Sequence, residues 1–295
     1  MLININNIKS TEIKSKWLDN KGVSLSMLRL DEIHPVISGN KLFKLHYFLQ
    51  EALQHPGQPI ITFGGAYSNH LTATAYAAKL LHIPSIGYVR GEKPPHLSHS
   101  LRQCIADGMQ LHFVPRDIYR QVAESGSSDK EGTIIPEGGY HATGARGAAL
   151  IMQTNAINNT THICTAVGTA TTLAGLLLGA TPNKKIIGIP VLKGMNDIEK
   201  RLIYLTSHLQ FANLEILQGY HFGGYAKKQQ ALINFMNDFY QLYGIPTDFV
   251  YTGKMMYAIM KNIEAGYFAA GSNIVCLHTG GLQGNKSLPA GTLIF

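Results

Sequence analysis

Two lysines lie one helical turn apart in the segment 37–48, which reads ISGNKLFKLHYF. Apolar residues at positions 42, 45, 48 and 49 predict a helix, and Ser38 is placed to cap its N-terminus. Lys41 and Lys44 then fall in the first turns, where a cation opposes the helix dipole at a cost of about 0.3–1 kcal/mol that surface lysines tolerate. If Lys41 instead forms an imine with an aldehyde cofactor, it is no longer a free cation, and Lys44 can pair with a phosphate of that cofactor.

Two turns have the composition of an anion-binding site. In TFGGAYSNH (62–70) a strand ends, two glycines follow, and Ser68 and Asn69 open a helix whose free N–H groups can hold an anion. In AVGTATT (166–172) three threonines offer hydroxyls beside another helix start, which suits a phosphate. Each turn taken alone is equally well explained as an ordinary capped connection. Neither matches the dinucleotide fingerprint or the P-loop, so binding of dinucleotides or nucleoside triphosphates is not predicted.

Two further glycine motifs follow later in the chain. We interpret PEGG (136–139) as a loop between domains rather than as part of a site, and His278 of HTGG (278–281) as a structural residue rather than a base. The sequence has no HExxH motif and no Cys/His ligand spacing, so no catalytic metal is expected. It also has no GxSxG motif, which argues against a hydrolase triad.

Composition restricts the class of protein further. The 295 residues are 45% hydrophobic and 15% charged, with a net charge of +7. The basic residues are scattered, so an acidic small ligand fits better than nucleic acid. Cys104, Cys164 and Cys276 form no CxxC pair. Cys164 and Cys276 lie in apolar, strand-like runs and are expected to be buried free thiols, as in a reducing compartment. The N-terminus lacks an apolar signal core and no apolar run is long enough to span a membrane, so a cytoplasmic protein is expected.

Strands and helices alternate along the chain. Strands are predicted at 59–63, 84–89, 161–167, 185–191 and 273–278, and helices at 71–81 and 172–180. This alternation is typical of parallel βαβ units in a doubly wound sheet, whose ligands bind at the carboxyl ends of the strands. Two clusters of such units, separated by the glycine-rich stretch 135–147, predict two α/β domains.

Five motifs in order resemble one enzyme family. SGNKLFKL (38–45) resembles the GGNKxRKL signature of the 1-aminocyclopropane-1-carboxylate deaminase / D-cysteine desulfhydrase family. TFGGAYSNH, IPEGG (135–139), VYTGK (250–254) and HTGG are similar to family stretches in the same order. The resemblance implies pyridoxal 5'-phosphate as cofactor and the tryptophan-synthase-β-like fold (fold type II), with two doubly wound domains of mostly parallel sheets. It further implies a large cofactor-binding domain of residues 1–42 and 151–295, a small domain of residues 43–150, and a homodimer.

The resemblance also implies roles for individual residues. Lys41 would be the catalytic Schiff-base lysine, Asn69 would bond the ring hydroxyl, and Ser68 would act beside the substrate carboxylate or Cα. The cofactor phosphate would be held by Lys44, Gly168, Thr169, Ala170, Thr171 and Thr172. The substrate side would be lined by the catalytic residues Tyr225 and Tyr251 and by Tyr67, His70, Thr279 and Gly280.

Thr252 and Thr279 bear on the reaction. Deaminases of the family resemble VYEGK and HLGG at these motifs, and the desulfhydrase branch resembles VYTGK and HTGG, as here. A glutamate near the ring nitrogen would keep it protonated, whereas the Thr252 hydroxyl would donate to an unprotonated nitrogen, a weaker electron sink that still permits loss of thiolate. The main prediction is therefore a D-cysteine desulfhydrase that releases pyruvate, sulfide and ammonia.

Several alternatives stay open. They are deamination of 1-aminocyclopropane-1-carboxylate to 2-oxobutanoate, elimination or racemisation of D-serine or a related amino acid, a cofactor-binding protein with little catalysis, and a module for another phosphorylated ligand. The chain also departs from the family, because its phosphate turn has fewer glycines and because Phe43 replaces the usual arginine.

Overall fold

A computed structural model describes residues 5–125 and 131–295 of the chain. Residues 1–4, which belong to the N-terminal stretch where no signal core is expected, lie outside the described residues. Within the described residues, the larger of two sheets has six strands in the order β1-β2-β10-β7-β8-β9. Of its pairings only β1 with β2 is antiparallel, and the others are parallel. The strands are β1 (Ser10–Ile13), β2 (Ser24–Leu28), β7 (His162–Val167), β8 (Lys185–Pro190), β9 (Leu214–Ile216) and β10 (Asn273–Leu277).

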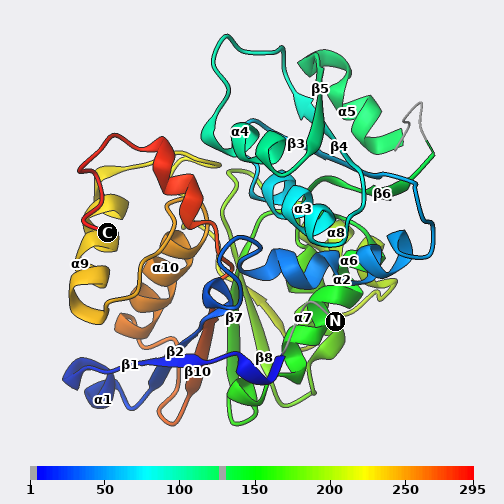
Figure 1. Cartoon of the computed structure of the whole chain (residues 1–295). Coiled ribbons are helices and arrows are strands. Elements are labelled where there is room, and N and C mark those ends of the chain that lie inside the picture. Colours follow the sequence, from blue (N-terminus) through cyan, green and yellow to red (C-terminus); the bar gives the residue numbers. More distant parts are fainter. Residues whose placement is uncertain (1–4, 126–130) are drawn as a thin grey trace.

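The second sheet has four parallel strands in the order β5-β4-β3-β6. They are β3 (Ile60–Gly64), β4 (Ser85–Arg90), β5 (Met109–Val114) and β6 (Thr133–Ile135). Figure 1 shows the two sheets in different parts of the molecule, with the second at the upper right. The predicted α/β fold of two mostly parallel sheets is confirmed.

Helices cover both faces of the large sheet because its strands are apolar on both sides. Ile163 of β7 and Val275 of β10 face the core shared with α2, α6, α7 and α8. Their neighbours Cys164 and Cys276 face the core shared with α1, α9 and α10. The helices are α1 (Lys16–Lys21), α2 (Asn40–Ala52), α6 (Ala142–Ala149), α7 (Thr171–Gly179), α8 (Ile198–Thr206), α9 (Gln230–Tyr243) and α10 (Thr252–Glu264).

The small sheet is covered in the same way. The helices α3 (Asn69–Leu80) and α4 (His99–Ala106) pack on one face through Leu71 and Leu101, and α5 (Arg116–Ser125) packs on the other through Tyr119. Alanines of α3 (Ala73, Ala77 and Ala78) are buried in the core that also contains residues of α2 and α7. Short 3-10 turns complete the fold, among them Glu137–Gly139 after β6.

The strands and helices predicted from the sequence are all present, with ends that differ by one or two residues. The cap of the lysine helix was predicted wrongly. Helix α2 begins at Asn40 with Gly39, not Ser38, at the N-cap position, and no side chain caps it. Gly39 has φ +71°, and a Cβ there would collide with the backbone of Thr279. The Thr279 carbonyl accepts the Asn40 N–H at 3.4 Å, so a distant loop replaces the side-chain cap.

All four strands of the small sheet lie within the predicted small domain of residues 43–150. The predicted boundary at 42/43, however, falls inside α2, whose apolar side chains belong to a core that contains residues of β10, α7 and also α3. The exact division of the chain into two domains therefore stays a prediction.

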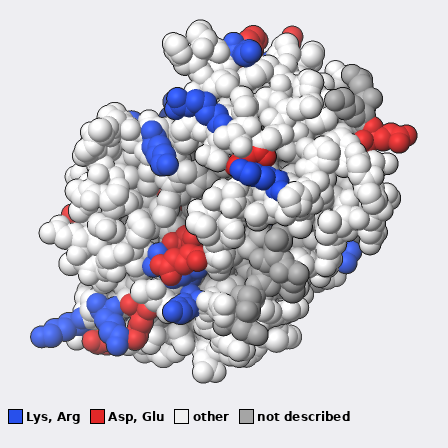
Figure 2. Space-filling view, in the orientation of Figure 1, with Lys and Arg blue, Asp and Glu red and all other residues white. Residues whose placement is uncertain are grey.

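The expectations about cysteines and charge can be compared with the structure. Cys164 and Cys276 are buried free thiols, as predicted, and Cys104 is a buried free thiol as well. On the face seen in Figure 2, lysines and arginines are spread over the surface rather than gathered in one patch. A search of the described residues finds no helix that is long and apolar enough to cross a membrane.

Candidate active site

A cavity of about 510 Å³ contains most of the residues predicted to do chemistry. Its wall includes the start of α2, the turn between β3 and α3, the turn between β7 and α7, and three loops from the last third of the chain. Of the predicted site residues it includes Lys41, Lys44, Tyr67, Ser68, Asn69, His70, Gly168, Thr169, Ala170, Thr171, Thr172, Tyr225, Tyr251, Thr279 and Gly280. Because parallel strands end at the same edge, turns far apart in sequence meet here.

Lys41 and Lys44 lie in the first turns of α2, and both face the cavity. Burial lowers the pKa of Lys41 to about 8, although Asp248 partly opposes this shift. The pKa of Lys44 is lowered well below its usual value by burial and by the charge of Lys41. The Lys41 Nζ donates to Asn40 Oδ1 at 2.7 Å and the Lys44 Nζ donates to the Gly138 carbonyl at 3.1 Å. Two poorly hydrated amines side by side favour an anionic or covalently bound ligand.

The start of α7 offers backbone donors to the same cavity. Its N-cap residue, Ala170, has φ +67°, and no side chain caps the helix although Thr171 and Thr172 are buried. The Thr172 hydroxyl accepts from Asn40 Nδ2 at 2.7 Å, which ties this turn to the lysine helix. Free N–H groups at a buried helix start fit a phosphate. With φ +67°, Ala170 is in the left-handed conformation, which a glycine would adopt more easily. This is the turn that has fewer glycines than the corresponding turn of the family.

The turn between β3 and α3 supplies polar side chains. Ser68 caps α3 by accepting the Leu71 N–H at 3.2 Å, which leaves its own hydroxyl proton free to donate elsewhere. The Oδ1 atom of Asn69 is buried and has no hydrogen-bond partner within the described part of the chain. Such an acceptor is costly unless a ligand donates to it. The lysine pair, the helix start and this acceptor together fit a phosphorylated aromatic aldehyde that carries a ring hydroxyl.

His70 and Tyr67 flank these residues. The His70 Nε2 lies 2.9 Å from Thr62 Oγ1, and burial together with the charges of Lys41 and Lys44 lowers its pKa to about 3. His70 is therefore neutral near pH 7 and can act only through hydrogen bonds. Tyr67 is 55% exposed at the wall of the cavity and packs on His99 with the ring centroids 5.9 Å apart.

Two tyrosines from the last third of the chain meet at the cavity. The rings of Tyr225 and Tyr251 are edge to face, with centroids 6.3 Å apart. Burial raises the pKa of both phenols, and that of Tyr251 is well above its usual value. Both side chains therefore stay protonated near pH 7. The two phenols share a hydrogen bond, which leaves one proton of the pair free to be donated to a ligand.

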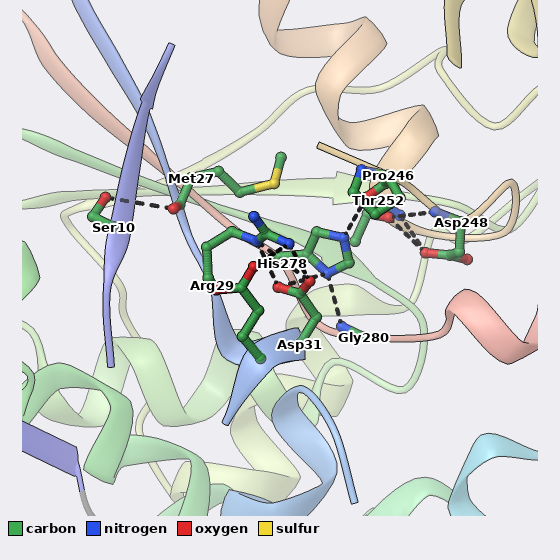
Figure 3. Close-up of polar contacts among 10 residues, drawn as sticks. Ser10, Met27, Arg29, Asp31, Pro246, Asp248, Thr252, His278 and Gly280 are labelled. Atoms are coloured by element: carbon green, nitrogen blue, oxygen red, sulfur yellow. Dashed lines mark hydrogen bonds and ion pairs between the residues drawn. The ribbon is translucent and has the colours of Figure 1, made fainter. Parts of the chain in front are cut away.

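Thr252 is not brought to the cavity wall, contrary to the prediction. It is fully buried at the start of α10. Its hydroxyl donates to Asp248 Oδ1 at 2.7 Å and accepts from the Asp248 N–H at 2.8 Å, as Figure 3 shows in part. Its only proton is directed to a carboxylate in this structure, so the predicted donation to a cofactor ring nitrogen would require this bond to be broken.

His278 holds the glycine loop next to the site rather than acting in it, as the sequence indicated. The Nε2–H donates to the Pro246 carbonyl at 2.7 Å and Nδ1 accepts the Gly280 N–H at 3.3 Å. Figure 3 shows Asp31 between this ring and Arg29. The Asp31 carboxylate lies 3.4 Å from Nδ1 and 2.7 Å from the guanidinium. This buried polar group fixes the 278–281 loop, which in turn caps α2.

The interpretation of PEGG as a loop outside the site was wrong. Glu137 and Gly138 line the cavity, and the Gly138 carbonyl accepts from Lys44. The position of IPEGG among the family motifs was the signal that pointed to a site. Arg90 also lines the cavity from the end of β4, with its guanidinium 5.5 Å from the Tyr119 ring centroid. Arg201 of α8 is a further wall residue that no sequence pattern indicated.

Among residues 5–125 and 131–295, no group of three or more His, Cys, Asp or Glu side chains is placed to hold a metal ion. The wall offers amines, amides, hydroxyls and backbone N–H groups, together with the Glu137 carboxylate, the His70 imidazole and the guanidinium groups of Arg90 and Arg201.

Comparisons with known proteins agree with this donor set. The sequence profile described as "Pyridoxal-phosphate dependent enzyme" matches residues 8–280. A Thermotoga maritima protein that carries the name 1-aminocyclopropane-1-carboxylate deaminase is 30% identical, over 89% of this chain and 90% of its own length. A D-cysteine desulfhydrase of Yersinia enterocolitica is 25% identical, over 94% of this chain and 92% of its own. A crystal structure of an ACC deaminase homologue superposes with a TM-score of 0.78 at 25% identity, covering 96% of this chain and 92% of that one.

Proposed function

Because the chain belongs to the family of pyridoxal-phosphate dependent enzymes, we propose that it releases ammonia from a small amino acid and that its main substrate is D-cysteine. Its cofactor is pyridoxal 5'-phosphate and its activity is that of a lyase or deaminase. The observation that carries the proposal is Lys41, an amine with its pKa lowered to about 8. It shares a cavity wall with Lys44, an uncapped helix start and the unpartnered Asn69 Oδ1.

The residues that would hold the cofactor follow from their chemistry. Lys44 and the N–H groups of residues 169–172 would bind its phosphate, and Asn69 Oδ1 would accept from its ring hydroxyl. When bound, pyridoxal phosphate supplies an aldehyde that condenses with an amine and a ring that accepts the electron pair left at Cα.

The other steps belong to this chain's own side chains. Lys41 Nζ would take the Cα proton, because an amine with a pKa of about 8 is partly neutral at pH 7 to 8. The Ser68 hydroxyl, whose oxygen already accepts from Leu71, would donate to the substrate carboxylate. The protonated pair of Tyr225 and Tyr251, whose phenols share one hydrogen bond, would donate its remaining proton toward the departing sulfur. The overall reaction converts D-cysteine and water to pyruvate, sulfide and ammonia.

A second candidate is deamination of 1-aminocyclopropane-1-carboxylate to 2-oxobutanoate. It is favoured by the higher identity to the Thermotoga maritima relative, 30% against 25% for the Yersinia enterocolitica desulfhydrase. The choice between the two substrates no longer depends on Thr252, since its hydroxyl is bound to Asp248. Thr279 at the cavity wall, where family deaminases have leucine, still favours D-cysteine. A homodimer and a cytoplasmic location, both expected from the sequence, belong to the same proposal.

The test is keto-acid release by cofactor-loaded protein from D-cysteine, L-cysteine, D-serine and 1-aminocyclopropane-1-carboxylate in parallel. We expect pyruvate and sulfide from D-cysteine. Release of 2-oxobutanoate from the cyclopropane substrate would favour the second candidate. Lys41→Ala should abolish turnover, whereas Lys261→Ala should not, because Lys261 lies on the surface in an ion pair with Glu264. Undiminished turnover by Lys41→Ala would exclude the mechanism.

A further inference from the structure

The loop that carries Tyr225 into the cavity has an unusual backbone. Five residues between 219 and 226 have positive φ, namely Gly219, Phe222, Gly223, Gly224 and Ala226. Phe222 (φ +50°) and Ala226 (φ +52°) are not glycines, so this conformation costs free energy. The loop keeps this shape only if its surroundings hold it.

Helix α10 provides that support along one face. The Tyr220 hydroxyl accepts from Asn262 Nδ2 at 2.8 Å. The Phe222 ring packs edge to face on Tyr257, with centroids 4.9 Å apart.

The third contact is made two residues further along the loop. The Gly224 carbonyl accepts from Lys254 Nζ at 2.7 Å. Every second loop residue thus contacts α10: residue 220 contacts position 262, residue 222 contacts position 257, and residue 224 contacts position 254. Of these three contacts, the one with Lys254 lies nearest to Tyr225 in the sequence. Tyr251, which Tyr225 meets at the cavity, is the N-cap residue of the same helix.

Lys254 is a costly residue to place there. Its side chain is fully buried, and burial lowers its pKa to about 8 while Asp248 opposes that shift. A methionine would fill similar space without burying an amine. Lys254 is not part of the cavity wall, so it does not serve the reaction by touching a ligand. What the amine adds is the hydrogen bond to the loop.

We propose that Lys254 is a positioning residue whose hydrogen bond to the Gly224 carbonyl fixes the 219–226 loop and thereby sets Tyr225 against Tyr251 at the cavity. This inference deepens the proposed function and rests on it, because Tyr225 has its role there. Lys254 is the last residue of the VYTGK motif. The proposal assigns this lysine a structural role, which is to hold the 219–226 loop, rather than a catalytic one.

The first test reads the loop without any activity. Lys227 and Lys228 are exposed and lie directly after the loop, so limited digestion of the holoenzyme with trypsin reports how often it opens. We expect Lys254→Met to accelerate cleavage after these lysines about tenfold or more, because the hydrogen bond to the Gly224 carbonyl is lost. Lys254→Arg, which keeps a donor, should restore slow cleavage, and the surface variant Lys261→Met should match wild type. Equal cleavage of Lys254→Met and wild type would overturn the proposal.

The second test is a double-mutant cycle on turnover of the amino acid substrate. Tyr225→Phe and Lys254→Met should each lower kcat, and the double variant should be no slower than Tyr225→Phe alone, with the cofactor absorbance unchanged. Losses that multiply, or a Tyr225→Phe variant as fast as wild type, would overturn the proposal. If Lys254→Met does not fold, Lys254→Gln replaces it, because its shorter amide does not reach the carbonyl. Should wild type turn over no amino acid, the proposed function fails while the digestion still decides the role of Lys254.

Discussion

Replacing Asp248 by asparagine tests the group that organises the start of α10. The Asp248 side chain is almost fully buried. Its Oδ2 accepts the N–H groups of Val250 and Tyr251, each at 2.9 Å. Its Oδ1 accepts the Thr252 N–H at 2.8 Å and the Thr252 hydroxyl at 2.7 Å. An amide keeps one acceptor oxygen, so in either orientation two donors face an NH2 group.

The size of the effect follows from these four bonds. A hydrogen bond to a charged acceptor contributes about 1.5–3 kcal/mol, so loss of two predicts a destabilisation of about 3–6 kcal/mol. The Thr252 hydroxyl can rotate and accept from the new NH2 group, which favours the orientation that keeps Val250 and Tyr251 bonded. We therefore expect a value near the lower end, about 3 kcal/mol.

Urea unfolding of Asp248→Asn and wild type, followed by circular dichroism with the m-value compared, measures this difference. Asp197→Asn is the matched control, since Asp197 is half exposed and its ion pair with Arg201 should contribute at most about 1 kcal/mol. If Asp248→Asn lost no more free energy of unfolding than Asp197→Asn, the carboxylate would not be what holds this helix start. The variant should also lower the pKa of Lys41 further, because Asp248 raises it.

Three other outcomes are expected. Burial lowers the pKa of Lys254 to about 8, so between pH 8 and about 10.5 this side chain holds its proton more tightly in the unfolded chain, and the stability of the cofactor-free wild type should rise with pH relative to that of Lys254→Met; a stability difference between the two proteins that stays constant across this range would contradict it. Thr252→Val should lower the free energy of unfolding by about 2 kcal/mol and leave kcat of the holoenzyme nearly unchanged; a large loss of kcat at unaltered stability would return this residue to the site. A Cβ at Gly147 would collide with the backbone of α2, so Gly147→Ala should destabilise by about 1–3 kcal/mol in the same unfolding assay, whereas Gly284→Ala, in open space, should not.

Local patterns predicted the elements and most of the wall of the cavity. Two short-range patterns indicated a strand that runs into a helix start. One is the apolar run of β7 followed by Gly168 and threonines, and the other is Ser68 followed by the alanines of α3. Both turns lie where the parallel topology predicts them. The order of the five motifs then indicated that the turns belong to one site, which no single turn established.

What the sequence did not show depends on partners that no local pattern specifies. Ser38 has the right chemistry for a cap, but the backbone of Thr279 occupies that end of the helix. The Thr252 hydroxyl could donate a hydrogen bond to a cofactor, but in the structure it donates to the Asp248 carboxylate. The spacing of an aspartate four residues before a threonine at a helix start was visible in the sequence and would have warned of this competition.

The place of β10 in the large sheet has a consequence for synthesis of the chain. This strand lies between β2 and β7, and the residues that follow it supply the backbone that caps the lysine helix. The four strands of the small sheet, by contrast, come from one continuous stretch between residues 60 and 135. On the ribosome the small sheet can therefore pair before β10 is synthesised, while β2 must wait for a partner that follows the whole small sheet in the chain. Until then β2 and β7 each lack the partner on the edge that β10 later occupies, and the nascent enzyme is open to wrong strand pairing during that interval.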